Sequence, residues 1–409
     1  MTGEEYLLFN QQKALTYDSL VENVYAGSYK VLDECVKEIA EISEDGFHCF
    51  AGYYDVDNIS PNGRNLLYLK VDEKANPGVD AASIMVFDLQ ERKSKFIYHT
   101  SAWCWQQGCR LRWINDNMFI FNDFIDGKYV TRSYSFFSKN TKTAFDCAFY
   151  DVSFNFNKAF CIDFDRLQAN RPGYGYSCRK SDVTNKSALG IDGLFVMTLS
   201  DKKLSQIVSF KTLTSEVSSQ PFENHYINHI SISPNGKRIM YFHLWAKDSL
   251  DMWKMRVLVS DLDGLNRVVI EEKDIISHYA WFDDNTLLLT RVLEDRCDYC
   301  FYDLLSGKKR VIVSSELIND GHPTFLSKRF FISDTYPLEN SMQHLFLYNL
   351  EKNERIPLVE IFSDPRLYID KRCDLHPRLH RDGLIVNFDT TYKNGVRSIK
   401  ILKLEGSYE

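Results

Sequence analysis

Histidine is the residue type whose positions in this chain most clearly indicate chemistry. The imidazole ring exchanges protons near neutral pH and is a common metal ligand. Six of the ten histidines occupy similar places relative to the predicted strands of the second half. They are His225, His229, His243, His278, His322 and His376. The pattern predicts that they converge on one site, and the alternative for each is a buried histidine with a structural role.

A carboxylate, an imidazole and two guanidinium groups lie close together near the end of the chain. Asp374 and His376 stand two residues apart, so on a strand their side chains face the same side. Arg372 and Arg378 share that parity. Arginine suits a planar carboxylate, which it binds through two parallel hydrogen bonds. We therefore expect Arg372 and Arg378 to bind an anionic substrate.

Aromatic residues in the first half indicate a sugar-binding surface. Trp105 and Gln106 belong to the stretch WCWQQG, and Arg171, Tyr174 and Tyr176 belong to RPGYGY in a long connection. Long loops on rigid scaffolds collect binding residues. We expect the first two residues to contact substrate, Arg171 to bind a carboxylate, and the tyrosines to act as acids or stacking groups. The alternative is packing of the loop against the body of the protein.

A repeated turn and strand must position these side chains. Residues 59–70 (ISPNGRNLLYLK) and 232–243 (ISPNGKRIMYFH) are nearly copies, and 380–389 (HRDGLIVNFD) is a weaker third copy. Each is a glycine-containing turn that leads into an apolar strand closing on a polar residue. Repetition of such a unit predicts a repeat architecture. If equivalent strands superpose, their closing residues lie in one region.

The spacing of the repeats and of the hairpins after them divides most of the chain into seven units. Their expected ranges are 46–98, 99–146, 147–212, 222–272, 273–314, 318–358 and 370–406. Seven four-stranded antiparallel units predict an all-β, seven-bladed β-propeller over residues 46–409. The apolar runs are too short for a helical solenoid. Apolar residues at roughly helical spacing over Val21–Ile42 predict a helical extension covering residues 1–45.

Composition excludes several classes of protein. Aromatic residues make up 14% of the chain, while 10 Pro and 19 Gly argue against disorder. A net charge of −7 without a basic block argues against a nucleic-acid partner. No window has the length of a membrane span, and the start lacks the pattern of a signal peptide. These features predict a cytoplasmic protein, and they leave the oligomeric state open.

The ten cysteines are scattered, with close pairs only at Cys104 and Cys109 and at Cys297 and Cys300. A zinc site would need a second close pair converging on each. We therefore expect reduced, buried or half-buried thiols.

Four segments of the second half together resemble a known family. They are the stretch 225–245, His278, the GHP and SDTYP motifs at 321–323 and 333–337, and DLHPR followed by Phe388 and Asp389. In this combination the chain resembles the TolB-like seven-bladed propellers related to oligogalacturonate lyase. The resemblance covers most of residues 46–406. It implies an enzyme that cleaves acidic oligosaccharides or polysaccharides by β-elimination.

The resemblance also implies roles for individual residues. His243 matches the position of the family's presumed base, and His278, Asp374 and His376 match three ligands of its manganese site. Lys371 stands where the family has a glutamine ligand. Two arrangements follow from this difference. Either Asp374, His376 and His278 hold the metal with His322 as a further ligand, or the positive charges of Lys371 and Arg372 take the place of the metal.

The stretch that leads into the second repeat copy carries two more histidines, His225 and His229. We assign both to substrate binding.

Three functions are compatible with the sequence. The first is a lyase-like enzyme acting on uronate-containing glycans, with a divalent metal such as Mn²⁺ as cofactor. The second is a non-catalytic propeller that binds a glycan or a protein. The third is a glycoside hydrolase, for which Asp334, Asp374 and Asp389 could supply the two carboxylates.

Overall fold

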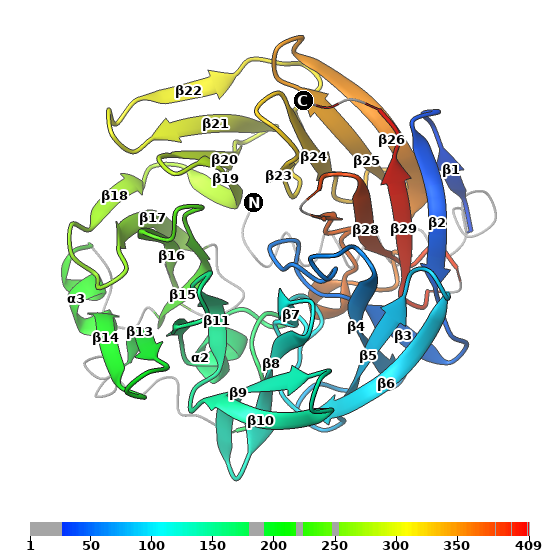
Figure 1. The fold of residues 1–409 in the computed structure, drawn as a ribbon. Helices are drawn as coiled ribbons and strands as arrows, with labels where there is room; N and C mark the ends of the chain where they lie inside the picture. Colours follow the sequence, from blue (N-terminus) through cyan, green and yellow to red (C-terminus); the bar gives the residue numbers. More distant parts are fainter. Residues whose placement is uncertain are drawn as a thin grey trace.

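The chain folds into a ring of seven antiparallel sheets (Figure 1). The structure, a computed structural model, describes residues 27–179, 192–217, 224–247, 253–380, 382–393, 395–406 and 408. Each sheet is one blade, and the ring is a seven-bladed β-propeller. The predicted fold class is confirmed.

The first three blades come from the first half of the sequence. Blade 1 contains β3 (Phe47–Phe50), β4 (Asn65–Asp72), β5 (Ala82–Asp88) and β6 (Lys93–Thr100). Blade 2 contains β7 (Arg112–Asn115), β8 (Met118–Ile125), β9 (Lys128–Ser135) and β10 (Asn140–Phe145). Blade 3 contains β11 (Phe149–Val152), β12 (Lys158–Cys161), β13 (Gly193–Thr198) and β14 (Leu204–Ser209).

The remaining blades follow in chain order. Blade 4 contains β15 (Asn224–Ile232), β16 (Arg238–Ala246), β17 (Lys254–Asp261) and β18 (Val268–Glu271). Blade 5 contains β19 (Ile275–Asp283), β20 (Thr286–Val292), β21 (Cys297–Asp303) and β22 (Lys309–Ile312). Blade 6 contains β23 (Thr324–Phe325), β24 (Phe330–Asp334), β25 (Met342–Asn349) and β26 (Glu354–Phe362). Blade 7 contains β27 (Arg378–Leu379), β28 (Ile385–Thr390) and β29 (Ser398–Leu404).

In the described part of the chain, three short helices lie between strands. They are α2 (Phe164–Asn170), α3 (Phe210–Ser215) and the 3₁₀-helix η2 (Ile369–Lys371). Among the described residues, none of the helices has the length and apolar character needed to cross a membrane.

Two strands near the start of the chain complete the last two blades. β2 (Val36–Ile42) pairs with β29 in blade 7, and β1 (Tyr29–Val31) adds a fifth strand to blade 6 (Figure 1, blue). The helix predicted over Val21–Ile42 is therefore wrong for residues 29–31 and 36–42, and residues 21–26 lie outside the described part. Blade 7 has only three strands of its own, and pairing its free edge overrides the helical spacing.

The repeated turns have the same hydrogen bonds. In the first copy the Ser60 hydroxyl donates to Asn62 at 2.7 Å and accepts from the Asn65 amide at 2.9 Å. In the second copy Ser233 donates to Asn235 at 2.8 Å and accepts from an amide at 3.0 Å. The same turn recurs in blade 3 at residues 153–158, where the sequence reads SFNFNK. In each of these blades the repeated turn thus leads into the second strand.

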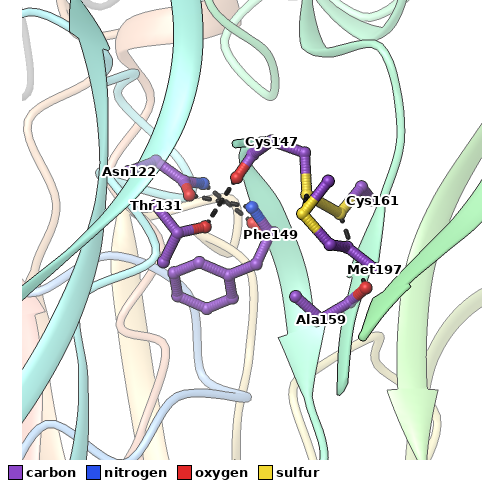
Figure 2. Close-up of a disulfide and its surroundings, with 7 residues drawn as sticks. All are labelled: Asn122, Thr131, Cys147, Phe149, Ala159, Cys161 and Met197. Carbon is purple, nitrogen blue, oxygen red and sulfur yellow. Dashed lines mark hydrogen bonds between the residues drawn. A yellow bond between two sulfur atoms is a disulfide. The ribbon is translucent and has the colours of Figure 1, made fainter. Parts of the chain in front are cut away.

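A disulfide joins Cys147 to Cys161 in blade 3 (Figure 2). The antiparallel pairing of β11 with β12 brings Phe149 opposite Cys161, which places Cys147 next to the end of β12. The Thr131 hydroxyl donates to the Cys147 carbonyl at 2.7 Å. The prediction of reduced thiols is wrong for this pair, because the hairpin joins cysteines that are 14 residues apart. The other eight cysteines are free, as predicted.

Candidate functional site

Four histidines from four consecutive blades meet near the propeller axis. His229 lies on β15, His278 on β19, and His322 and His376 come just before β23 and β27. Ring centroids are 6.3 Å apart for His229 and His278, 3.9 Å for His278 and His322, and 4.5 Å for His322 and His376. All four are buried. We call them the central histidine group.

Three side chains of this region could hold a metal ion. Nitrogen and oxygen atoms of His322, Asp374 and His376 all lie within 4.8 Å of one another. The Nε2 atoms of both histidines are buried and have no hydrogen-bond partner among the described residues. Buried polar atoms without partners are rare in folded proteins. These atoms therefore fit a divalent cation, and we call the three residues the metal-ligand group.

Asp334 orients the first of these histidines. Its carboxylate accepts from Nδ1 of His322 at 2.9 Å, which directs Nε2 toward Asp374 and His376. Such a carboxylate–histidine pair is the usual support of a metal ligand. Burial alone would lower the pKa of His322, but Asp334 outweighs it and raises the pKa. Asp334 also accepts from the backbone amide of His376 at 3.2 Å, so one carboxylate holds both histidines.

His278 forms a second carboxylate–histidine pair beside the metal-ligand group. Its Nδ1 lies 2.9 Å from the Asp320 carboxylate, which leaves Nε2 as the ring's acceptor. Burial lowers the pKa of His278, and the neighbouring His322 lowers it further. His278 is not one of the three residues that converge within 4.8 Å. It is placed to accept a proton next to them.

A chain of hydrogen bonds fixes the tautomer of His229. Gln107 and Tyr150 both donate to the side-chain oxygen of Asn228, at 3.1 and 2.9 Å. The amide nitrogen of Asn228 therefore faces Nε2 of His229, at 3.3 Å, and donates to it. The neutral ring then carries its proton on Nδ1, which is buried and without a partner in the described structure. His229 is thus a hydrogen-bond donor aimed at the centre of the site.

The backbone of the site is strained at two of its histidines. His229 and His376 have φ angles of 54° and 46°, in the left-handed region that residues other than glycine rarely adopt. Such conformations persist only where surrounding contacts impose them, and they gather at functional sites.

Tyr53 lies among the central histidines and was not identified from the sequence. Its ring centroid is 5.5 Å from that of His229 and 4.7 Å from that of His376. The side chain is fully buried, and its hydroxyl has no partner among the described residues. The neighbouring Tyr54 differs, because its hydroxyl donates to the Tyr279 carbonyl at 2.8 Å. The only sequence signal was the aromatic pair that follows the first strand of blade 1.

Arg171 contributes a guanidinium group without a carboxylate partner. It stacks on Tyr174 and Trp253, with centroid distances of 4.9 and 4.3 Å, and it forms no ion pair within the described residues. Tyr174 in turn contacts His229 and Tyr53. Arg171 also has hydrogen bonds with the Tyr174 and Tyr226 side chains, and a guanidinium that lies on aromatic faces without a carboxylate partner in the described structure suits an anionic ligand.

The glycines of the RPGYGY loop allow this placement. Gly173 has a φ of 90°, and a Cβ atom there would lie 2.9 Å from the Cα of Asp370. A Cβ atom on Gly175 would lie 2.1 Å from the Phe164 carbonyl oxygen of α2. Only glycine lets the loop approach both segments.

Arg372 is held by the metal-ligand group itself. Its guanidinium binds both oxygens of Asp374, with Nε at 2.8 and 3.1 Å and one terminal nitrogen at 2.7 Å. It also lies over the ring of Tyr336, 4.7 Å from the centroid. Burial alone would raise the pKa of Asp374, but Arg372 and His322 outweigh it and lower the pKa. The sequence correctly placed Asp374, His376 and Arg372 together.

His243 lies apart from the central histidine group. Its Nε2 is 2.9 Å from Nδ1 of His225, and its Nδ1 accepts from Nε of Arg256 at 3.1 Å. Arg256 also donates to Glu216 at 2.8 Å. Because arginine can only donate, His243 must carry its proton on Nε2 and has no lone pair available. We call His225 and His243 the outer histidine pair.

Four other residues expected in the site have structural contacts instead. Tyr176 stacks on Phe164, with ring centroids 4.3 Å apart, and Trp105 is buried in the core between blades. Gln106 donates to the carbonyl oxygens of residues 370 and 372 and so positions the Arg372 segment. Arg378 is paired with Asp389 at 2.6 Å and donates to the Gly52 carbonyl. The expectation that Tyr176, Trp105 and Arg378 face a substrate is not supported, because core packing and this ion pair occupy them.

Comparison with known proteins places the fold. The structure is similar to that of an oligogalacturonate lyase in complex with manganese, with a TM-score of 0.64 and 12% identity, over 93% of this chain and 98% of that one. An oligogalacturonate lyase from Vibrio parahaemolyticus gives a TM-score of 0.63, with the same identity and coverage. No sequence family matches the chain, and no curated protein matches it. The resemblance inferred from the sequence is thus confirmed for the fold.

Proposed function

We propose that this protein is a metal-dependent lyase that cleaves uronate-containing oligosaccharides by β-elimination. One observation carries the proposal. Two imidazoles with unpartnered Nε2 atoms converge with the Asp374 carboxylate, and the nearby Arg171, which contacts Tyr174 beside His229, forms no ion pair in the described structure. A divalent cation and an arginine side chain without a carboxylate partner in the described structure are together suited to bind the carboxylate of a sugar acid. The fold shared with oligogalacturonate lyases adds support.

Each residue has a role in this proposal. His322, Asp374 and His376 hold the cation, which is Mn²⁺ by analogy with the manganese complex named above. When bound, such an ion supplies a positive charge that stabilises the carboxylate of the substrate's uronate as negative charge develops on it. Arg171 binds the same carboxylate from the side of Tyr174.

The base must accept the proton next to the carboxylate. We assign this role to His278, since Asp320 orients its ring and leaves Nε2 as an acceptor. The electrons of the broken C–H bond form a carbon–carbon double bond as the 4-linked oxygen leaves. His243, the base implied by the family resemblance, has both nitrogens engaged.

His229 and Tyr53 supply donors to this reaction. The proton on Nδ1 of His229 and the hydroxyl of Tyr53 have no partner in the described structure. Both can donate to oxygens of the sugar, and Tyr53 can protonate the departing oxygen. Tyr174 forms one wall of this region.

Metal content and product absorbance test the proposal. The purified protein is stripped with a chelator, reloaded with Mn²⁺ and incubated with oligogalacturonate and a neutral oligosaccharide. We expect ultraviolet absorbance from a conjugated double bond with the acidic substrate only, and only after reloading. New reducing ends without this absorbance would instead indicate hydrolysis. Binding without any cleavage would indicate a glycan-binding propeller.

The glycoside hydrolase alternative has less support. Asp334 is bound to His322, Asp374 to Arg372, and Asp389 to Arg378. A hydrolase needs one carboxylic acid and one free carboxylate across a glycosidic bond. All three carboxylates already have imidazole or guanidinium partners. The cytoplasmic location stays a prediction.

A further inference from the structure

We propose that Arg372 is a built-in counter-ion of the metal-ligand group, and that a divalent cation must displace it from Asp374 in order to bind. The guanidinium occupies both oxygens of the one carboxylate in that group. Asp374 is 0% exposed, whereas the Arg372 side chain is 26% exposed. The carboxylate is therefore fixed inside the protein, and its partner reaches it from the more open side.

A buried carboxylate needs a positive partner. Removing one member of a buried ion pair costs roughly 3–5 kcal/mol, because the other charge is left uncompensated. Before metal binds, Arg372 is the only cation within ion-pair distance of Asp374 among the described residues, apart from His376 at 3.9 Å. After metal binds, the cation takes over this task. Two positive charges competing for one carboxylate must weaken the binding of each.

The surroundings of Arg372 allow its side chain to move while its backbone stays in place. Its carbonyl oxygen accepts from Gln106 at 2.7 Å and from Arg397 at 2.9 Å, which fixes the main chain. Its guanidinium already lies over Tyr336, and one nitrogen is 3.5 Å from the Tyr336 hydroxyl. The released side chain can remain on this aromatic face.

Release of Arg372 would couple the metal to an anionic ligand. The metal binds Asp374, and the released guanidinium of Arg372 can then bind the carboxylate of a ligand nearby. By linkage, such a ligand must increase metal affinity by the same factor by which metal increases its own. This consequence depends on the proposed function for the identity of the ligand, but competition for Asp374 does not.

Calorimetric titration of Mn²⁺ into the full-length, metal-stripped protein tests the competition. Arg372→Gln removes the positive charge and the paired hydrogen bonds to Asp374, and we expect Mn²⁺ affinity to rise at least about tenfold. Arg372→Lys keeps the charge and should stay closer to the wild type. The matched control is Lys371→Met, which removes a neighbouring charge that lies over Trp105 rather than on Asp374 and adds no oxygen ligand. We expect this control to change affinity less than about threefold.

The sign of the change decides the question. If a residue merely orients a metal ligand, its removal lowers metal affinity roughly 10- to 100-fold. Unchanged or weaker Mn²⁺ binding by Arg372→Gln, or no binding by any variant, would overturn the proposal. Equal tightening by Lys371→Met would also overturn it, because overall charge would then explain the effect.

Thermal unfolding gives a second readout. Without metal, Arg372→Gln should melt below the wild type, and saturating Mn²⁺ should raise its melting temperature more than that of the wild type. An equal shift in both proteins contradicts competition. If Arg372→Gln tightens Mn²⁺ binding but the wild type cleaves no uronate, the proposed function fails and this inference stands. If the wild type cleaves uronate but Arg372→Gln does not bind Mn²⁺ more tightly, this inference fails and the proposed function stands.

Discussion

The central histidine group and the outer histidine pair contain the same residue type at similar depth but differ in their hydrogen bonds. His322 and His376 each keep a buried nitrogen without a partner in the described structure. His243 has both nitrogens engaged, by His225 and Arg256. The comparison teaches that burial and position in a repeat do not identify a reactive histidine. An available lone pair or proton does.

The largest effect is expected from removing a central ligand. His322→Ala deletes one of the three side chains that could hold metal and leaves the Asp334 carboxylate unpaired. We expect Mn²⁺ affinity to fall by more than about 100-fold and lyase turnover to fall to background. Calorimetry and the absorbance assay measure the two effects. Retained metal binding would contradict the assignment of the metal-ligand group.

The next effect separates a base from a ligand. His278→Gln should lower turnover by roughly 10²–10⁴-fold, which is the usual contribution of a general base. Mn²⁺ affinity should stay within about threefold, because His278 lies outside the three converging residues. A parallel loss of metal affinity would show instead that His278 is the fourth ligand, as the family resemblance implies.

Arg171→Gln should act on binding. A hydrogen bond to a charged group contributes about 1.5–3 kcal/mol, so KM for an oligouronate should rise roughly 10- to 100-fold with little change in Mn²⁺ affinity. Steady-state kinetics on acidic substrates measures this change. Since Arg171 forms no ion pair among the described residues, the variant should lose little stability. An unchanged KM would remove Arg171 from the site.

The outer histidine pair should respond in stability rather than in activity. His243→Gln breaks bonds to His225 and Arg256 and should lower the free energy of unfolding by about 1–3 kcal/mol. Turnover should stay within about threefold once both proteins are folded. Loss of turnover at unchanged stability would instead restore His243 as the base.

The pH dependence of stability gives the smallest effect. Burial, followed by the nearby His225 and Arg256, holds the pKa of His243 well below its usual range. The folded state therefore favours the neutral ring, and this stabilisation is complete above the unfolded pKa of about 6.5 and is lost as the pH falls. His243→Gln should flatten the slope of unfolding free energy below pH 6.5 by up to about 1.4 kcal/mol per pH unit. Denaturant melts between pH 5 and 7 measure it, and an unchanged slope would contradict the buried neutral histidine.

Much of the fold was predictable because it rests on local patterns. The SPNG turns, with the Ser60 and Ser233 hydroxyls closing them, recur with the spacing of the blades. The predicted unit 222–272 became β15–β18 over 224–271. β2 was missed because its strand conformation comes from pairing with β29, more than three hundred residues away. The Cys147–Cys161 disulfide also depends on pairing, that of β11 with β12.

Only some members of the site, and none of their roles, were predictable. Residue types and close spacing indicated that Asp374, His376 and Arg372 lie together, but the parity argument does not apply, because residues 372–377 lie in an irregular segment between η2 and β27. The availability of atoms could not be predicted, because it depends on hydrogen-bond partners that strand pairing and tertiary contacts supply. Tyr53 and Tyr54 are adjacent in sequence and both buried, yet of the two only Tyr53 lacks a hydroxyl partner in the described structure.

The sequence by itself determined the seven-bladed repeat and several of the side chains of the site, since strand periodicity and turn chemistry are local properties of the chain. The tertiary structure alone decided which histidines could react. Hydrogen bonds between neighbouring strands of blade 4 engage both nitrogens of His243, whereas Nε2 of His322 and of His376 has no partner in the described structure. These contacts depend on how the strands pair and on how blades 6 and 7 bring His322 and His376 together, which local sequence patterns do not specify.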